Sequence, residues 1–74
     1  MTRHIALRTA SREGCPVVVP SGWGRFDYAL PGGITASADT LAETEADIRD
    51  RGYTQYLLVK DAPLERQYIS GVPA

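Results

Sequence analysis

The chain has 74 residues, a formal net charge of -1 and 43% hydrophobic residues. This length predicts one domain over residues 1–74 with a thin core, because small domains bury only about 60% of the surface that the unfolded chain exposes. The composition excludes a disordered chain, and no apolar run approaches the roughly 20 residues that span a bilayer. The single cysteine, Cys15, excludes an internal disulfide, and we expect a cytoplasmic protein with no membrane association.

Two short strands are predicted at the start of the chain. Residues 4–9 alternate between polar and apolar side chains, with Ile5 and Leu7 on one side, which predicts a half-buried strand followed by a turn at residues 11–14. Val17–Val19 is a β-branched run of strand length. The prolines on either side of it, Pro16 and Pro20, favour an edge position or a strand start.

Residues 25–38 predict a β-hairpin. Its first arm alternates, and the apolar side chains share one face: Phe26, Tyr28 and Leu30. Arg25 and Asp27 point to the opposite face. Pro31 and Gly32 supply the fixed and the positive φ angles of a type II turn. The alternation then continues through Ile34, Ala36 and Ala38.

A helix is predicted directly after the hairpin. Thr40 and Glu43 have the spacing of a capping box, and Asp39 is an alternative N-cap. Leu41, Thr44 and Ile48 form a narrow apolar stripe that must pack on a sheet. Gly52 is the expected glycine after the last turn, with Tyr53 contacting Ile48 in a Schellman motif.

Acidic side chains dominate the opposite face of this helix: Glu43, Asp47 and Asp50. Two ion pairs are predicted four residues apart, Glu45 with Arg49 and Asp47 with Arg51. The acids precede the arginines, which complements the helix dipole. This face is either a solvated surface, which is the more common case, or a docking site for a basic partner.

Two apolar segments complete the chain. Residues 56–59 predict a central strand that is covered on both faces, and residues 67–70 predict a final edge strand. Strands and helix are segregated along the sequence. The predicted fold is therefore α+β, with a small, mostly antiparallel sheet of four to five strands, one helix packed on one face, and a β-β-β-α-β core.

The reactive residues do not form a catalytic pattern. His4 stands alone near the terminus, and Cys15 precedes a proline in a predicted turn. The glycines match neither a phosphate-binding loop nor a dinucleotide fingerprint, and no cluster has metal-ligand spacing. We therefore expect no catalytic residues, no cofactor and no metal, and we interpret the chain as a non-enzymatic protein.

Binding to another protein is the preferred interpretation. Trp23 lies between glycines in a loop, where it is either an exposed interface residue or a cap on the core. Our candidate partner-binding residues lie around the hairpin and on the helix: Trp23, Arg25, Asp27, Glu43, Asp47 and Asp50. An open sheet edge could also pair with a partner strand or with a second copy of the chain.

One family resembles part of this sequence. The segments at residues 16–19, 28–32, 34–36 and 39–43, the last reading Asp-Thr-Leu-Ala-Glu, are similar to the N-terminal domain of HicB-type antitoxins. The resemblance covers about half of the chain and implies a partial RNase-H-like fold with no catalytic carboxylate set. It also implies a role in occluding a toxin ribonuclease. The sequence departs from the family pattern in that the residues after the helix are too few to form the DNA-binding domain that such antitoxins normally carry.

Two further functions remain open. The size and the acidic helix are also typical of phage-encoded inhibitors of host defence, such as anti-CRISPR proteins, whose partner would be a host nuclease complex. An RNA-binding domain is the second alternative. It would use the arginines of the first half, Arg3, Arg8, Arg12 and Arg25, with Trp23 or Tyr28 for stacking. The near-neutral charge disfavours nucleic acid, since phosphate neutralisation dominates such affinity.

Overall fold

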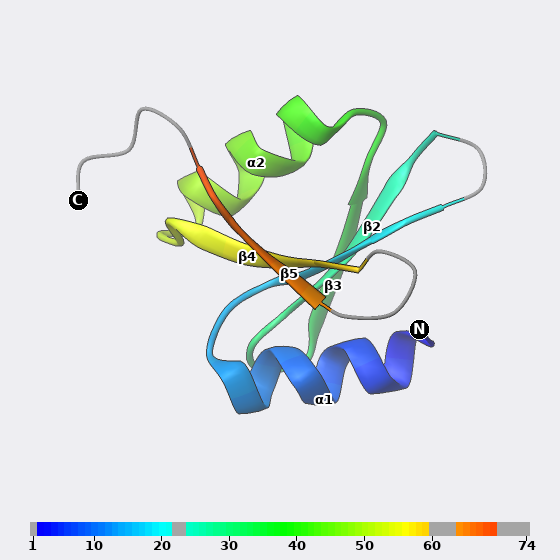
Figure 1. The fold of residues 1–74 in the computed structure, drawn as a ribbon, viewed down its shortest axis with the longest axis vertical. Coiled ribbons are helices and arrows are strands. Elements are labelled where there is room, and N and C mark those ends of the chain that lie inside the picture. Colours follow the sequence, from blue (N-terminus) through cyan, green and yellow to red (C-terminus); the bar gives the residue numbers. More distant parts are fainter. Residues whose placement is uncertain (1, 22–23, 60–63, 70–74) are drawn as a thin grey trace.

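The computed structural model describes residues 2–21, 24–59 and 64–69. Its elements in chain order are α1 (Arg3–Glu13), β1 (Val17–Pro20), β2 (Phe26–Leu30), β3 (Ile34–Ala38), α2 (Leu41–Asp50), β4 (Gln55–Val59) and β5 (Leu64–Tyr68). The strands form one sheet in the order β3-β2-β1-β4-β5 (Figure 1). Only β1 and β4 pair in parallel. The predicted α+β class, the mostly antiparallel sheet and the β-β-β-α-β core are confirmed.

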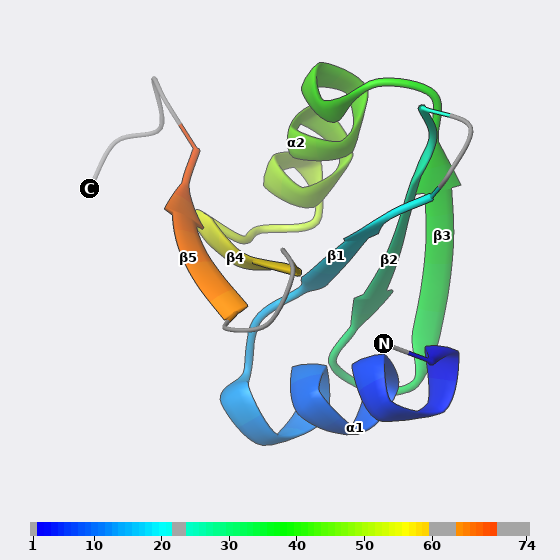
Figure 2. The same ribbon diagram turned by 45° about the vertical axis from the view of Figure 1, so that its right-hand side comes forward.

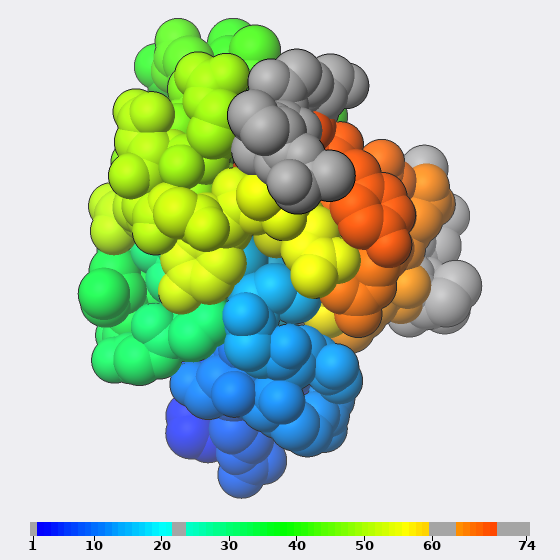
Figure 3. Space-filling model, turned by 90° about the vertical axis from the view of Figure 1, so that its left-hand side faces the viewer, coloured from blue at the N-terminus to red at the C-terminus, as the bar shows by residue number. Residues whose placement is uncertain are grey.

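The two helices cover opposite faces of the sheet (Figure 2). Each face has its own apolar cluster. The cluster under α2 is built around Tyr28, Ile48 and Tyr56. The cluster under α1 contains smaller side chains, among them Ala6 and Ala29. In the space-filling view, α2 and α1 lie at opposite ends of the molecule (Figure 3).

Helix α1 replaces the strand predicted over residues 4–9, so that prediction is wrong. The hydroxyl of Thr2 accepts a hydrogen bond from the Ile5 backbone N–H at 3.3 Å and caps the helix. Gly14 ends the helix in the left-handed conformation, with φ of 72°, and donates to the Ala10 carbonyl. The buried face repeats at helical spacing through Ala6 and Ala10, whereas Ile5 is 46% exposed. The predicted turn at residues 11–14 is the last helical turn.

Strand β1 lies at the centre of the sheet, so the edge position favoured by its prolines is wrong. Proline has no backbone N–H, and the backbone nitrogens of Pro16 and Pro20 both face β4. This follows because Leu57 of β4 donates to the Pro16 carbonyl at 2.8 Å, and every second residue of a strand turns its backbone groups toward the same neighbour. The β4 register covers only Val17 and Val18. Neither proline therefore lies at a position where pairing with β4 needs a backbone N–H. The alternative prediction, a strand start, is consistent with Pro16.

The hairpin and helix α2 are confirmed. Strands β2 and β3 pair over their full lengths. The Thr40 hydroxyl accepts from the Glu43 backbone N–H at 3.1 Å, which makes Thr40 the N-cap rather than Asp39. At the other end, Tyr53 N–H donates to the Ile48 carbonyl and Gly52 N–H to the Arg49 carbonyl, as in a Schellman motif. Strand β4 carries buried residues of both clusters, as predicted for residues 56–59. A final edge strand is present as predicted, but it is β5 over Leu64–Tyr68 instead of residues 67–70.

Candidate functional site

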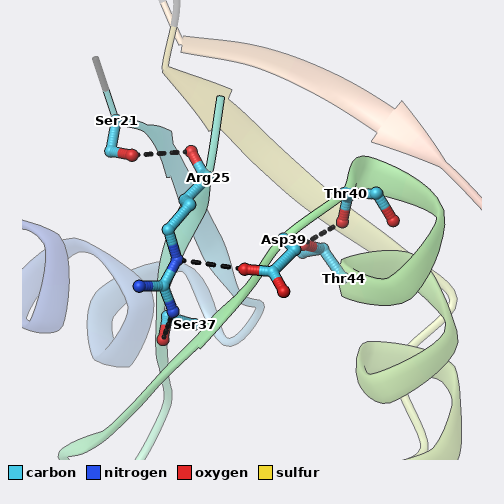
Figure 4. Close-up of polar contacts among 6 residues, drawn as sticks. All are labelled: Ser21, Arg25, Ser37, Asp39, Thr40 and Thr44. Atoms are coloured by element: carbon cyan, nitrogen blue, oxygen red, sulfur yellow. Dashed lines mark hydrogen bonds and ion pairs between the residues drawn. The ribbon is translucent and has the colours of Figure 1, made fainter. Parts of the chain in front are cut away.

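Arg25 lies at the open end of the β2–β3 hairpin, where its side chain reaches from the start of β2 to the end of β3 (Figure 4). Its Nε lies 3.2 Å from Oδ1 of Asp39, and its guanidinium donates to the Ser37 hydroxyl at 3.5 Å. The Ser21 side chain fixes the adjacent backbone by donating to the Arg25 carbonyl at 3.0 Å. Arg25 thus ties the end of β3 to the start of β2 and stands beside the N-terminus of α2.

Asp47 faces the sheet and is not a free surface acid. The Tyr28 hydroxyl donates to its Oδ2, and Arg51 Nε lies 3.0 Å from the same oxygen, which confirms the predicted pair of Asp47 with Arg51. The hydrogen bond from Tyr28 lowers the pKa of Asp47. Burial, together with the neighbouring carboxylate, raises the pKa of Tyr28 to about 12.

Glu45 is the second acid of α2 that reaches the sheet. The Tyr56 hydroxyl donates to its Oε2 at 2.7 Å, in place of the predicted pair with Arg49. Burial, and then this hydrogen bond, raises the pKa of Tyr56. Two tyrosines of the sheet thus anchor α2, and part of its acidic face is structural. Glu43 and Asp50 remain exposed to solvent.

Strand β3 has a hollow on each of its faces. The hollow on the α2 side measures about 430 Å³ and includes Arg25, Ala36, Ala38, Asp39, Glu43, Asp47 and Arg51. The hollow on the α1 side measures about 390 Å³ and includes Arg3, Val19, Asp27, Ala29, Thr35 and Ser37. The β3 side chains that line these hollows are small, and α1 contributes Arg3 and Ala6 to the hollow on its side.

The hydrogen-bonding directions along the sheet determine which groups β3 exposes. Ser21 N–H donates to the Arg25 carbonyl at 2.7 Å, so Arg25 and, within β2, residues 27 and 29 turn their backbone groups toward β1. The alternate residues of β2 then pair with Ile34, Ala36 and Ala38 of β3. The N–H and C=O groups of Thr35 and Ser37 therefore point outward from the edge.

The two edges of the sheet differ in how they are protected. Edge strands usually carry charges or prolines that discourage pairing with other chains. Strand β5 contains Glu65 and Arg66, and Arg66 donates to the Gln55 side chain at 2.9 Å. Strand β3 reads Ile-Thr-Ala-Ser-Ala and has neither a charge nor a proline. The β3 edge is the less protected of the two.

The predicted site residues are only partly assembled. Arg25, Glu43 and Asp47 border the α2-side hollow. Asp27 lies on the opposite face, beside Arg3, and Asp50 lies at the far end of α2, outside both hollows. Trp23 falls outside the described residues. The sequence analysis did not identify Thr35 and Ser37 as residues of an open edge. The pattern that could have indicated it is the run of five uncharged residues, 34–38, after the hairpin turn.

The reactive side chains lie apart from these hollows. His4 is exposed on the first turn of α1. Cys15 is buried behind the end of α1, and burial raises the pKa of its thiol. Within residues 2–21, 24–59 and 64–69, no group of three or more His, Cys, Asp or Glu side chains is placed to hold a metal ion. Neither residue lines either hollow.

Comparison with known proteins identifies no relative. No family model matches the chain, and neither the curated proteins nor the solved structures give a significant match. The similarity to HicB-type antitoxins stays a prediction. In the part of the chain that the structure describes, no helix has the length and apolar character needed to cross a membrane.

Proposed function

We propose that this protein is a non-enzymatic binding module that engages another protein by accepting one of its strands at the edge of β3. The observation that carries the proposal is the combination of an uncharged edge strand with a hollow on each of its faces. In strand addition, main-chain hydrogen bonds give affinity, and pockets for alternate side chains give specificity.

The energetics require both contributions. Thr35 and Ser37 offer two N–H and two C=O groups, and each hydrogen bond adds about 0.5–1.5 kcal/mol net. Four such bonds amount to about 2–6 kcal/mol before the cost of ordering the added strand. A dissociation constant of 1 mM already corresponds to about 4 kcal/mol. Side chains that enter the hollows must therefore supply most of a useful affinity.

The biological role that we propose is inhibition of the bound protein. The β-β-β-α-β core accords with the fold implied by the antitoxin resemblance, whose target would be a toxin ribonuclease. An inhibitor of a host nuclease complex could use the same edge. Growth rescue from a toxin encoded beside this gene would support the first role, and restored phage plating on an immune host would support the second.

Strand addition is tested by selecting random eight-residue peptides against the immobilised protein and measuring their affinity for two variants. Thr35→Pro removes an outward N–H without removing a bond to β2, and Thr35→Val is the matched control that keeps the N–H. We expect the selected peptides to lose at least tenfold in affinity for Thr35→Pro and less than twofold for Thr35→Val. Equal affinity for both variants, with circular dichroism showing both folded, would refute the proposal.

One observation supports the RNA-binding alternative. Helix α1 places His4, Arg8 and Arg12 four residues apart on its exposed side. Arg12 is already paired with Glu13 at 3.5 Å, which leaves a small basic stripe. If Arg8 and Arg12 each contact one phosphate of a single-stranded RNA, a plot of log affinity against log salt concentration should have a slope of about -1.4. Absence of binding at low salt would eliminate this alternative.

A further inference from the structure

We infer that the β3 edge selects an extended strand that carries an arginine or lysine opposite Ala36 or Ala38, on the side that faces α2; this inference rests on the proposed function. The floor of the hollow on that side is formed by the half-buried Ala36 and Ala38. Because these side chains are single methyl groups, they leave room for a long neighbouring side chain. The carboxylate of Glu43 stands at the border of the same hollow.

The charges around this hollow favour a cation. Asp39, Glu43 and Asp47 border it, and Arg25 and Arg51 balance only two of them. Arg25 is paired with Asp39 and Arg51 with Asp47. Among the described residues, Glu43 has no ion-pair partner, and its side chain is exposed. An incoming cation therefore meets one uncompensated carboxylate, whereas an incoming anion meets a net negative border.

The geometry of strand addition brings a cation to this place. Side chains alternate between the two faces of a strand, so partner residues opposite Ala36 and Ala38 lie on the α2 side. The aliphatic stem of a lysine or arginine would cover the two alanines, and its charged end would extend toward Glu43. The α1-side hollow contains Arg3 and Asp27 together and so favours neither sign.

A second copy of this chain fits the edge less well than a basic strand. Antiparallel pairing of β3 with itself would follow a two-fold axis perpendicular to the sheet, so both α2 helices would flank the junction on the same face. Like charges placed opposite each other in an interface are unfavourable. The strand of the second copy would also bring no basic residue, because β3 is uncharged.

Three synthetic heptapeptides test the inference. Each has valine at alternate positions, and the remaining positions are arginine in the first, threonine in the second and glutamate in the third. We expect the arginine peptide to bind at least threefold tighter than the threonine peptide at low salt, the glutamate peptide to bind most weakly, and the differences to shrink at high salt. Glu43→Gln should reduce the arginine preference, and Glu13→Gln, on α1 away from β3, should not.

The outcomes separate the inference from the function on which it rests. Equal binding of all three peptides, lost in Thr35→Pro, would overturn the charge preference and leave strand addition intact. Binding that Thr35→Pro leaves unchanged, or no binding of any peptide at about 1 mM, would overturn both. Concentration-dependent dimerisation in sedimentation velocity, abolished by Thr35→Pro, would identify a second copy as the occupant and refute the basic-strand inference.

Discussion

Replacing Tyr28 with phenylalanine removes one hydroxyl that connects the sheet to α2. Tyr28 is 4% exposed, and its hydroxyl donates to Asp47. A hydrogen bond to a charged group contributes about 1.5–3 kcal/mol. The loss should lie near the lower end, because Asp47 keeps Arg51 at 3.0 Å and its side chain is 36% exposed, so that water can replace the hydroxyl. We expect Tyr28→Phe to lower the free energy of unfolding by about 1–2 kcal/mol, or the midpoint temperature by about 4–16 °C.

Urea denaturation followed by circular dichroism measures this loss, with Tyr68→Phe as control, because Tyr68 is 70% exposed and its change should cost less than about 0.5 kcal/mol. The folded-state pKa of Tyr28 is raised from 10.0 to about 12. The contribution of the protonated Tyr28 hydroxyl to the free energy of unfolding is therefore fully present below pH 10 and is lost as the pH rises toward 12. The difference between wild type and Tyr28→Phe should shrink over that interval. Equal stability of the two proteins at pH 7 would refute the anchoring role.

Three further predictions concern the core, the helix cap and the thiol. Ile48→Ala should lower the free energy of unfolding by about 2–5 kcal/mol in urea titrations, because Ile48 on α2 is fully buried against the sheet; a loss below 1 kcal/mol would contradict its place in the core. Thr40→Ala should cost about 0.5–2 kcal/mol through loss of the cap on α2, and Thr40→Ser should restore most of it in thermal melts. Cys15 is 3% exposed, so its reaction with a thiol reagent should be slow in buffer and fast in urea, and rapid labelling of the native protein would contradict its burial.

The elements with two agreeing local signals could be predicted from the sequence. The hairpin had strict alternation and a Pro-Gly turn, and α2 had a capping residue, an apolar stripe and a terminal glycine. Helix α1 was missed because residues 4–9 also alternate, while its helical signals lie outside that window, at Thr2, Ala10 and Gly14. The central place of β1 was missed because a proline is harmless in an inner strand when its N–H position faces no partner.

The candidate site was less predictable than the fold. The acids of α2 looked equivalent in the sequence, but the register of the sheet brings Tyr28 under Asp47 and Tyr56 under Glu45. Those pairings depend on the packing of α2, which local patterns do not encode. The outward direction of the Thr35 and Ser37 backbone groups follows from the hydrogen bond between Ser21 and Arg25, which lies between β1 and β2 and not in β3 itself. Only the assembled sheet connects the two.

Backbone amide exchange at the β3 edge tests the central claim most directly. In the free protein, the outward amides of Thr35 and Ser37 should exchange faster than those of Ile34, Ala36 and Ala38, which pair with β2. Saturation with a bound partner or a selected peptide should slow exchange at Thr35 and Ser37 while leaving β5 unchanged. Protection confined to β5 or to α1, with fast exchange persisting at Thr35 and Ser37, would contradict the account.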